Sequence, residues 1–273
     1  MSRTIYLQPI FVPDEKRFKR NLDSLNSFII YCKKWNVNIN CLFGGWGKKE
    51  YMDQIIKLLQ DKSLPFNVVN ISRFEKNYGK ATVVNHLVEK ADDKGLEYDF
   101  ILTADSDILF KPDVPNMVER LENCAKELEE YRKIPFGIIT FNQEGDNRHW
   151  KKVYENELNT KSENFVYGNT HEGYAGGCIF VNRKAWDRVG GYRVMGVYAG
   201  DDGWLMLDLY NQGFSLNLIL SLSIIHPEEN DDDYKLLKDR VLQRDSRGGK
   251  IKNNINNIIE EFDEFWLKTK EFE

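Results

Sequence analysis

The sequence of 273 residues lacks long apolar runs, paired cysteines and any large excess of charge. Because a membrane-spanning helix needs about 18 or more consecutive apolar residues and none occur together here, we expect no membrane segment. The opening MSRTIYLQPIFV is too short an apolar run for a signal peptide, so we expect a cytoplasmic protein. The net charge of -5 and the pI near 5.6 argue against a protein that coats nucleic acid through charge alone.

The four cysteines are few and scattered: Cys32, Cys41, Cys124 and Cys178. Their spacings match neither a zinc site nor the disulfide framework of a small secreted protein, so we expect reduced, half-buried thiols. What the chain does contain is 41% hydrophobic and 13% aromatic residues, which predicts a folded globular protein.

Segments with strand character alternate with segments of helical periodicity. The alternation predicts an α/β fold with a mostly parallel sheet covered by helices on both faces. The expected strands cover residues 4–11, 37–45, 66–72, 98–104 and 136–142, and the expected helices cover 14–35, 51–59, 80–91 and 114–131.

We divide the chain into one domain, 1–230, and a C-terminal helical extension, 231–273, in which RDSRGGK separates two helices. Within the domain, 1–112 is the expected nucleotide-binding half and 113–230 the second half. Residues 143–174 are polar and predict a long functional loop. Its aromatic residues either stack on a bound sugar or nucleobase or pack within the loop, and the sequence favours neither: Trp150, Tyr154, Phe165 and Tyr167.

Two aspartates, Asp105 and Asp107, follow the predicted strand 98–104 with only Ser106 between them. Ligands of such sheets bind beyond the carboxyl ends of the strands. If the chain stays extended, residues two apart point to the same side and both carboxylates face one point. Such a pair suits Mg²⁺ or Mn²⁺ bound to a substrate's phosphates. By itself, the pair fits equally well a turn with Asp107 in solvent.

A second group of motifs lies further along the chain. Gly176 and Gly177 remove side chains where a strand begins, which allows close approach to the backbone. A Gly-Gly turn at 190–191 follows a short helix, and Asp201 and Asp202 then precede an apolar-periodic segment. They predict either a helix cap or a general base.

The order of these motifs resembles the metal-dependent GT-A glycosyltransferases, especially the family 2 enzymes and the C-terminal region of galactosyltransferases. Gly-Gly, Trp186 in a short helix, Gly-Gly-Tyr and an acidic pair follow one another as in those enzymes. NYGKATVVNHLVEKA is similar to their Gly-Lys-x(4)-Asn helix, and Asp105-Ser106-Asp107 to their Asp-x-Asp motif. The resemblance covers residues 4–227.

The resemblance implies a GT-A fold, with a Rossmann-like central sheet, that transfers a sugar from a nucleotide sugar, a UDP-sugar above others, to a hydroxyl acceptor with inversion. It also implies roles for single residues. Asp107 and His226 would ligate Mn²⁺ or Mg²⁺, and Asp105 would contact the metal or the donor ribose. In the acceptor and catalytic half, 113–230, Asp202 would be the base and Asp201 would orient the acceptor. The remaining residues would bind the donor: Lys80, Asn85, Gly176 and Gly177.

Two features leave substrate choice open. The second strand ends in CLFGGWGKKE and lacks the Asp-containing turn by which many family 2 enzymes read uracil. The basic stretch 235–252, in which Arg244 and Arg247 adjoin Gly248 and Gly249, fits a solvated helix face, a loop that closes on the donor diphosphate, or a contact to nucleic acid.

Three other functions remain as alternatives. A DNA-base-modifying glycosyltransferase would use a hydroxylated nucleobase in place of an acceptor carbohydrate. A metal-dependent phosphoryl transferase or nuclease explains Asp105 and Asp107 but not the glycine-rich second group. A non-catalytic carbohydrate-binding module would tolerate loss of Asp202.

Overall fold

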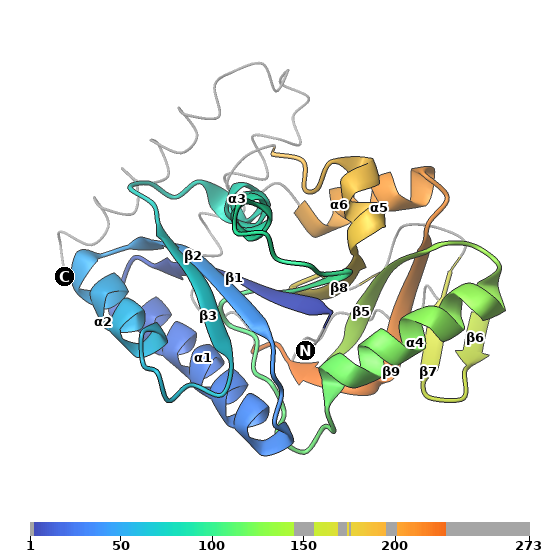
Figure 1. The fold of residues 1–273 in the computed structure, drawn as a ribbon, viewed down its shortest axis with the longest axis horizontal. Coiled ribbons are helices and arrows are strands. Elements are labelled where there is room, and N and C mark those ends of the chain that lie inside the picture. Colours follow the sequence, from blue (N-terminus) through green and yellow to red (C-terminus); the bar gives the residue numbers. More distant parts are fainter. Residues whose placement is uncertain (1–2, 145–155, 169–173, 175, 195–200, 228–273) are drawn as a thin grey trace.

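The computed structural model describes residues 3–144, 156–168, 174, 176–194 and 201–227. A nine-stranded sheet in the order β3-β2-β1-β4-β8-β5-β9-β7-β6 lies between two layers of helices (Figure 1). Helices α1, α2 and α4 cover one face, and α3, α5 and α6 cover the other. The predicted α/β architecture, with helices on both faces of a central sheet, is confirmed.

The first half of the sheet is parallel, as the sequence predicts. Strands β1 (Thr4–Val12), β2 (Asn40–Gly47), β3 (Asn67–Arg73) and β4 (Phe100–Ala104) pair in register with one another. They are joined by α1 (Glu15–Trp35), α2 (Lys49–Leu59) and α3 (Gly79–Asp93). Helix α1 begins at a side-chain cap, where Asp14 accepts from the Arg17 N–H at 2.7 Å, and ends at the left-handed Asn36.

The second half of the sheet is mixed. Strand β8 (Cys178–Asn182) runs antiparallel to both of its neighbours, β4 and β5 (Phe136–Glu144), whereas β5 and β9 (Ser215–Ile225) are parallel. Helices α4 (Met117–Arg132), α5 (Arg183–Val189) and α6 (Asp201–Asn211) belong to this half. The predicted parallel pairing therefore holds for β1 to β4 and for β5 with β9, and β8 departs from it because it runs antiparallel to both neighbours.

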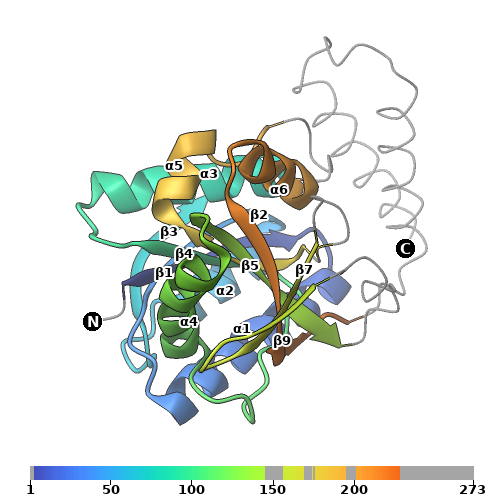
Figure 2. The same ribbon diagram turned by 90° about the vertical axis from the view of Figure 1, so that its right-hand side faces the viewer.

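The polar segment 143–174 is not a single long loop. Gln143 and Glu144 complete β5, and β6 (Asn156–Asn159) and β7 (Asn164–Tyr167) form a hairpin on β9 (Figure 2). Phe165 is 1% exposed, and the Arg132 guanidinium lies 3.9 Å from the Tyr167 ring centroid, so these two aromatics pack within the fold. Trp150 and Tyr154 lie outside the described residues.

The two faces of the sheet bury separate apolar clusters. Beneath α1, α2 and α4 the cluster is aromatic, with Tyr6 stacked on Phe28 at 4.1 Å between ring centroids. Beneath α3, α5 and α6 it is mainly aliphatic, around Leu87, Trp186 and Leu205. All four cysteines are free and are more deeply buried than expected, and burial raises the pKa of each thiol.

No described helix is both long and apolar enough to cross a bilayer. The predicted extension 231–273, with Arg244 and Arg247, lies outside the described residues. The boundaries at 112 and 230 stay predictions.

Candidate active site

The candidate site lies where the parallel and mixed halves of the sheet meet. Because β8 is antiparallel to β4, it begins beside the point at which β4 ends. The Asp105 N–H, directly after β4, donates to the Gly177 carbonyl at 2.6 Å, directly before β8. This junction brings the Asp-Ser-Asp segment and the Gly-Gly segment together, as the position of each at a strand end suggests.

The aspartates after β4 lie in a turn. Strand β4 ends at Ala104, and the Ile108 N–H donates to the Asp105 carbonyl at 3.2 Å. The carboxylates have different partners: Asp105 contacts Lys80, whereas Asp107 faces His226 and Arg20. The chain turns at Asp105, so the condition of an extended strand, on which a shared direction of the two carboxylates depends, is not met.

Lys80, in the first turn of α3, links the two sides of this junction. Its Nζ lies 2.7 Å from Asp105 Oδ1 and 2.8 Å from each carboxylate oxygen of Asp202. Burial lowers the pKa of the ammonium, but the charges of Asp105 and Asp202 outweigh this effect and raise it well above its usual value. Lys80 is therefore a fixed positive charge between two carboxylates.

Asp202, in the first turn of α6, receives further hydrogen bonds. The Tyr192 hydroxyl donates to Oδ1 at 2.7 Å, and the Gly177 N–H donates to Oδ2 at 3.0 Å. Burial alone would raise the pKa of this carboxyl, but Lys80, Tyr192 and Gly177 together hold it below its ordinary value. Asp202 is thus an ionised carboxylate held on both oxygens.

The two glycines before β8 have different consequences. A Cβ at Gly176 would lie 2.3 Å from Asp202 Oδ2, so the absence of a side chain there makes room for the Asp202 carboxylate. Gly177 has φ +82, and a Cβ there would lie 3.5 Å from Asp105 Oδ2. The space predicted at Gly176 for a donor sugar is occupied by Asp202.

Two neighbouring carboxyls have raised pKa values. Burial raises the pKa of Asp105, and the Lys80 charge offsets this only in part. Burial and the charge of Asp202 raise the pKa of Asp201 to about 7. Asp201 is 8% exposed, and its Oδ1 has no hydrogen-bond partner among the described residues.

Asp107 and His226 form the part of the predicted metal set that the structure brings together. Backbone hydrogen bonds of 2.9 and 3.0 Å between Leu109 and Ile225 tie the turn after β4 to the end of β9. As a result, His226 Nε2 lies 3.6 Å from Asp107 Oδ1. His226 Nδ1 lies 3.2 Å from Gln143 Oε1, and donation from Nδ1 leaves Nε2 with a lone pair toward Asp107.

Asp105 has a different partner on Oδ1, which is bonded to Lys80. Within the described part of the chain, no three His, Cys, Asp or Glu side chains gather as a metal cluster. One carboxylate oxygen and one imidazole nitrogen nevertheless fit a cation that takes its other ligands from phosphate and water. The residues present therefore suit a shared metal site.

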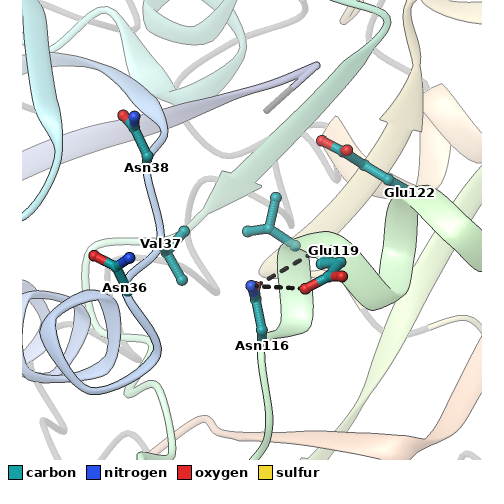
Figure 3. Close-up of a pocket in the computed structure, with 7 residues that line it drawn as sticks. Asn36, Val37, Asn38, Asn116, Glu119 and Glu122 are labelled. Atoms are coloured by element: carbon teal, nitrogen blue, oxygen red, sulfur yellow. Dashed lines mark hydrogen bonds between the residues drawn. The ribbon is translucent and has the colours of Figure 1, made fainter. Parts of the chain in front are cut away.

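A cavity of about 240 Å³ lies elsewhere, between the segment before β2 and the start of α4 (Figure 3). Asn36, Asn38, Asn116, Glu119 and Glu122 are among its lining residues. The Thr4 hydroxyl, at the start of β1, donates to Glu122 at 2.7 Å, which places this cavity near the amino end of that strand. None of the predicted site residues lines it.

Comparison with known proteins identifies the family of this chain. The sequence model described as glycosyl transferase family 2 matches residues 47–190. This chain belongs to glycosyl transferase family 2. The matched part of this family 2 chain contains Lys80, Asp105, Asp107 and the two glycines before β8, whereas Asp202 and His226 follow it. No curated protein matches the chain.

Solved glycosyltransferases share the fold of this family 2 chain, and the expected GT-A architecture is confirmed. TarS residues 1–349 from S. aureus in complex with UDP-GlcNAc has a TM-score of 0.55 and 13% identity, covering 85% of this chain and 60% of that one. The mannosyltransferase PcManGT from Pyrobaculum calidifontis in complex with GDP-Man and Mn²⁺ has a TM-score of 0.55 and 12% identity, covering 91% and 65%. The longer TarS structure is covered over only 40% of its length.

Three side chains of the site were missed in the sequence. Gln143, the next-to-last residue of β5, lies beside His226, and its position as a polar residue near a strand end is a usable signal. Tyr192 completes the Gly-Gly-Tyr motif, whose aromatic residue gave no sign of its hydroxyl partner. Arg20 Nη1 lies 3.9 Å from Asp107 Oδ2, and nothing in the helical pattern of α1 singled it out.

Asn85, an expected donor-binding residue, makes hydrogen bonds with both side-chain polar atoms to the backbone of Tyr192. Its Nδ2 donates to the Tyr192 carbonyl at 2.9 Å, and its Oδ1 accepts from the Tyr192 N–H at 3.0 Å. In the structure Asn85 therefore contacts the residue that supports Asp202.

Proposed function

We propose that this family 2 protein transfers a sugar from a nucleotide-sugar donor to a hydroxyl acceptor, with inversion at the anomeric carbon. The observation that carries this proposal is the bridge that Lys80 makes between Asp105 and Asp202. Asp105, the expected donor-side carboxylate, and Asp202, the expected base, both lie within 2.8 Å of one ammonium. This nearness supports the proposal, because a displacement reaction needs its catalytic groups held in fixed positions around the reacting carbon.

Asp202 is the proposed base. Its carboxylate takes the proton of the acceptor hydroxyl while that oxygen forms a bond to the anomeric carbon. The bond from this carbon to the diphosphate oxygen breaks on the opposite face, and the diphosphate leaves with the electron pair. Asp202 is ionised at neutral pH, and the Lys80 contact that lowers its pKa also weakens it as a base until that contact is released.

Lys80 is proposed to respond to the donor. An incoming diphosphate brings negative charge close to its ammonium and competes with Asp202 for hydrogen bonds. Release of Lys80 from the carboxylate frees an Asp202 oxygen for the acceptor hydroxyl. Asp201, directly preceding the base, is the proposed acceptor-orienting residue.

Asp107 and His226 would hold Mn²⁺ or Mg²⁺, and Asp105 would contact the donor ribose. The bound cation would supply positive charge against the diphosphate as it leaves. The Asp107–His226 pair supports this role, as does the presence of Mn²⁺ with GDP-Man in a structure of the same fold. The Lys80 contact of Asp105 favours Asp107 over Asp105 as the metal ligand.

A UDP-sugar is the proposed donor and a carbohydrate hydroxyl the proposed acceptor. The complex of TarS with UDP-GlcNAc shows that this fold accommodates a UDP-sugar. The other functions weighed above gain no support of their own. Family membership disfavours a nuclease. Phe165 is buried in the core, so it is not free to stack on an acceptor sugar or a nucleobase.

The test is a screen of UDP- and GDP-sugars that measures nucleoside diphosphate release with Mn²⁺, with Mg²⁺ and with chelator. We expect turnover only with metal, with a large loss in Asp107→Ala and in Asp202→Asn. Asp208→Asn is the matched control, because Asp208 lies on α6 with its own partner, Arg193. Turnover that withstands the chelator would remove the metal role, and full activity in Asp202→Asn would remove the base.

A further inference from the structure

Tyr192 is a buried tyrosine whose hydroxyl has a role that packing does not explain. Its side chain is 2% exposed, and its ring lies edge-on to Trp186 at 5.3 Å between centroids. A phenylalanine would fill the same space. The hydroxyl instead donates to Asp202 Oδ1 at 2.7 Å.

The backbone of Tyr192 is held as firmly as its hydroxyl. Asn85, in the middle of α3, bonds both its N–H and its carbonyl. The preceding Gly191 has φ +76, and a Cβ there would lie 2.7 Å from Asn85 Oδ1 and 2.9 Å from Trp186 Cζ2. Glycine is therefore required for this close approach.

Lys80 and Asn85 lie on the same helix and act on the same carboxylate by different routes. Lys80 bonds Asp202 directly, and Asn85 does so through Tyr192. The Lys80 ammonium also lies 5.8 Å from the centroid of the Tyr192 ring. The Gly-Lys-x(4)-Asn segment of α3 thus contacts the expected base from two directions.

We propose that Tyr192 is a positioning residue for Asp202, held in place by Asn85, and that the Asn of this segment supports the base and does not read the donor. The inference rests on the proposed function, in which Asp202 takes the acceptor proton. With the Tyr192 hydroxyl and the Gly177 N–H on different oxygens, the carboxylate has one orientation. Once the donor draws Lys80 away, as proposed above, Oδ1 is held by the hydroxyl, and without the hydroxyl the carboxylate turns about its Cβ–Cγ bond and the base is misaligned.

The first test is Tyr192→Phe, assayed with the nucleotide sugar and metal that give turnover in the wild type. We expect kcat to fall about 10-fold, as for a lost hydrogen bond to a charged group, while KM for the donor changes less than about twofold. Tyr98→Phe is the matched control, because it removes a hydroxyl that donates to Asp92 at 2.9 Å, away from the site. A wild-type kcat in Tyr192→Phe would overturn the inference.

The second test separates a positioning role from general loosening of the fold. Urea midpoints are measured for Tyr192→Phe, Asp202→Asn and the double variant. If the hydroxyl acts on Asp202, the double variant loses less than the sum of the two single losses. Additive losses would contradict the contact.

Asn85→Ala gives an independent check, because it keeps the phenol but removes both bonds to its backbone. We expect a lower kcat with the donor KM unchanged, whereas a raised donor KM with unchanged kcat would restore Asn85 to donor binding. The two proposals fail in different ways. An inactive Asp202→Asn beside a fully active Tyr192→Phe overturns only this inference, and a fully active Asp202→Asn overturns the base and the inference together.

Discussion

The two halves of the sheet contribute different parts of one site. The parallel half, β1 to β4 with its helices, supplies Lys80, Asp105 and Asp107. The mixed half supplies Asp202, Tyr192 and His226, from α6, the turn after α5 and the end of β9. Lys80 binds Asp105 of its own half and Asp202 of the other half. The chemistry therefore depends on how the halves join, more than on either motif alone.

The antiparallel strand β8 creates this junction. A parallel strand beside β4 would end where β4 ends and would place its own carboxyl-terminal residues beside Asp105. Because β8 runs the other way, its amino end, with Gly177, lies there and offers both a carbonyl to Asp105 and an N–H to Asp202. The following predictions test this junction in order of expected effect.

Lys80→Met removes the charge that joins the halves but keeps a side chain of similar length. It leaves two part-buried carboxylates facing each other, and we expect a loss of about 3–5 kcal/mol in the free energy of unfolding at pH 7, together with loss of turnover. Urea denaturation measures the first and diphosphate release the second. Lys111→Met is the control, since its bond to the half-exposed Glu144 is at the surface and should contribute less than about 1 kcal/mol. Equal losses in both variants would contradict the bridge.

Asp201→Asn tests the buried carboxyl beside the base. The pKa of Asp201 is raised from 3.8 to about 7, so between these values the folded protein binds a proton that the unfolded chain does not. Wild-type stability should therefore fall as pH rises from about 4 to about 7, by on the order of 3–4 kcal/mol from this group. Asn cannot titrate, so the variant should lack this loss. Identical pH profiles of urea midpoints in the two proteins would rule out the raised pKa.

Gly176→Ala places a methyl group where the Asp202 carboxylate lies. Because that carboxylate is fixed by Lys80, Tyr192 and Gly177, it cannot move aside without losing a hydrogen bond. We expect turnover to fall about 100-fold, equivalent to about 2.7 kcal/mol in transition-state stabilisation. Initial rates at saturating donor measure it, and rates within twofold of wild type would show that the glycine is not required.

Gly203→Ala, only one residue beyond Asp202, should have the smallest effect and the opposite sign. A Cβ there meets none of the described residues within 4 Å, and the position lies in the first turn of α6. Alanine should stabilise the helix by about 0.5–1 kcal/mol in urea denaturation, with turnover unchanged. Destabilisation would mean that the space beside this residue is filled.

Much of the site was predictable because its residues end strands or begin helices. Asp105 follows the apolar strand β4, and His226 follows the apolar strand β9. Gly176 lies just before β8. All three positions are therefore expected at an edge of the sheet. The apolar spacing after Asp202 predicted the helix start that the structure has. Such signals are local, so a single sequence carries them.

The errors arose where distant segments decide the outcome. The turn at Asp105 has a local hydrogen bond from Ile108 and a second bond to Gly177, which lies far away in the chain. The alternation of apolar and polar residues reveals neither contact. The sequence predicts a loop where β6 and β7 form a hairpin, because these strands are short and lie in a polar segment. Its partners, β9 for the backbone and Arg120 for the buried Glu163, are far away in the chain.

The sequence by itself determined the element types, the α/β class and the order of the motifs, because hydrophobic periodicity and strand-end positions are local properties. The tertiary structure decided which charges meet. Lys80 and Asp202 are 122 residues apart, and they are neighbours only because antiparallel β8 brings the mixed half of the sheet against the end of β4. At the same junction the Asp105 carboxylate contacts Lys80, whereas the Asp107 carboxylate faces His226.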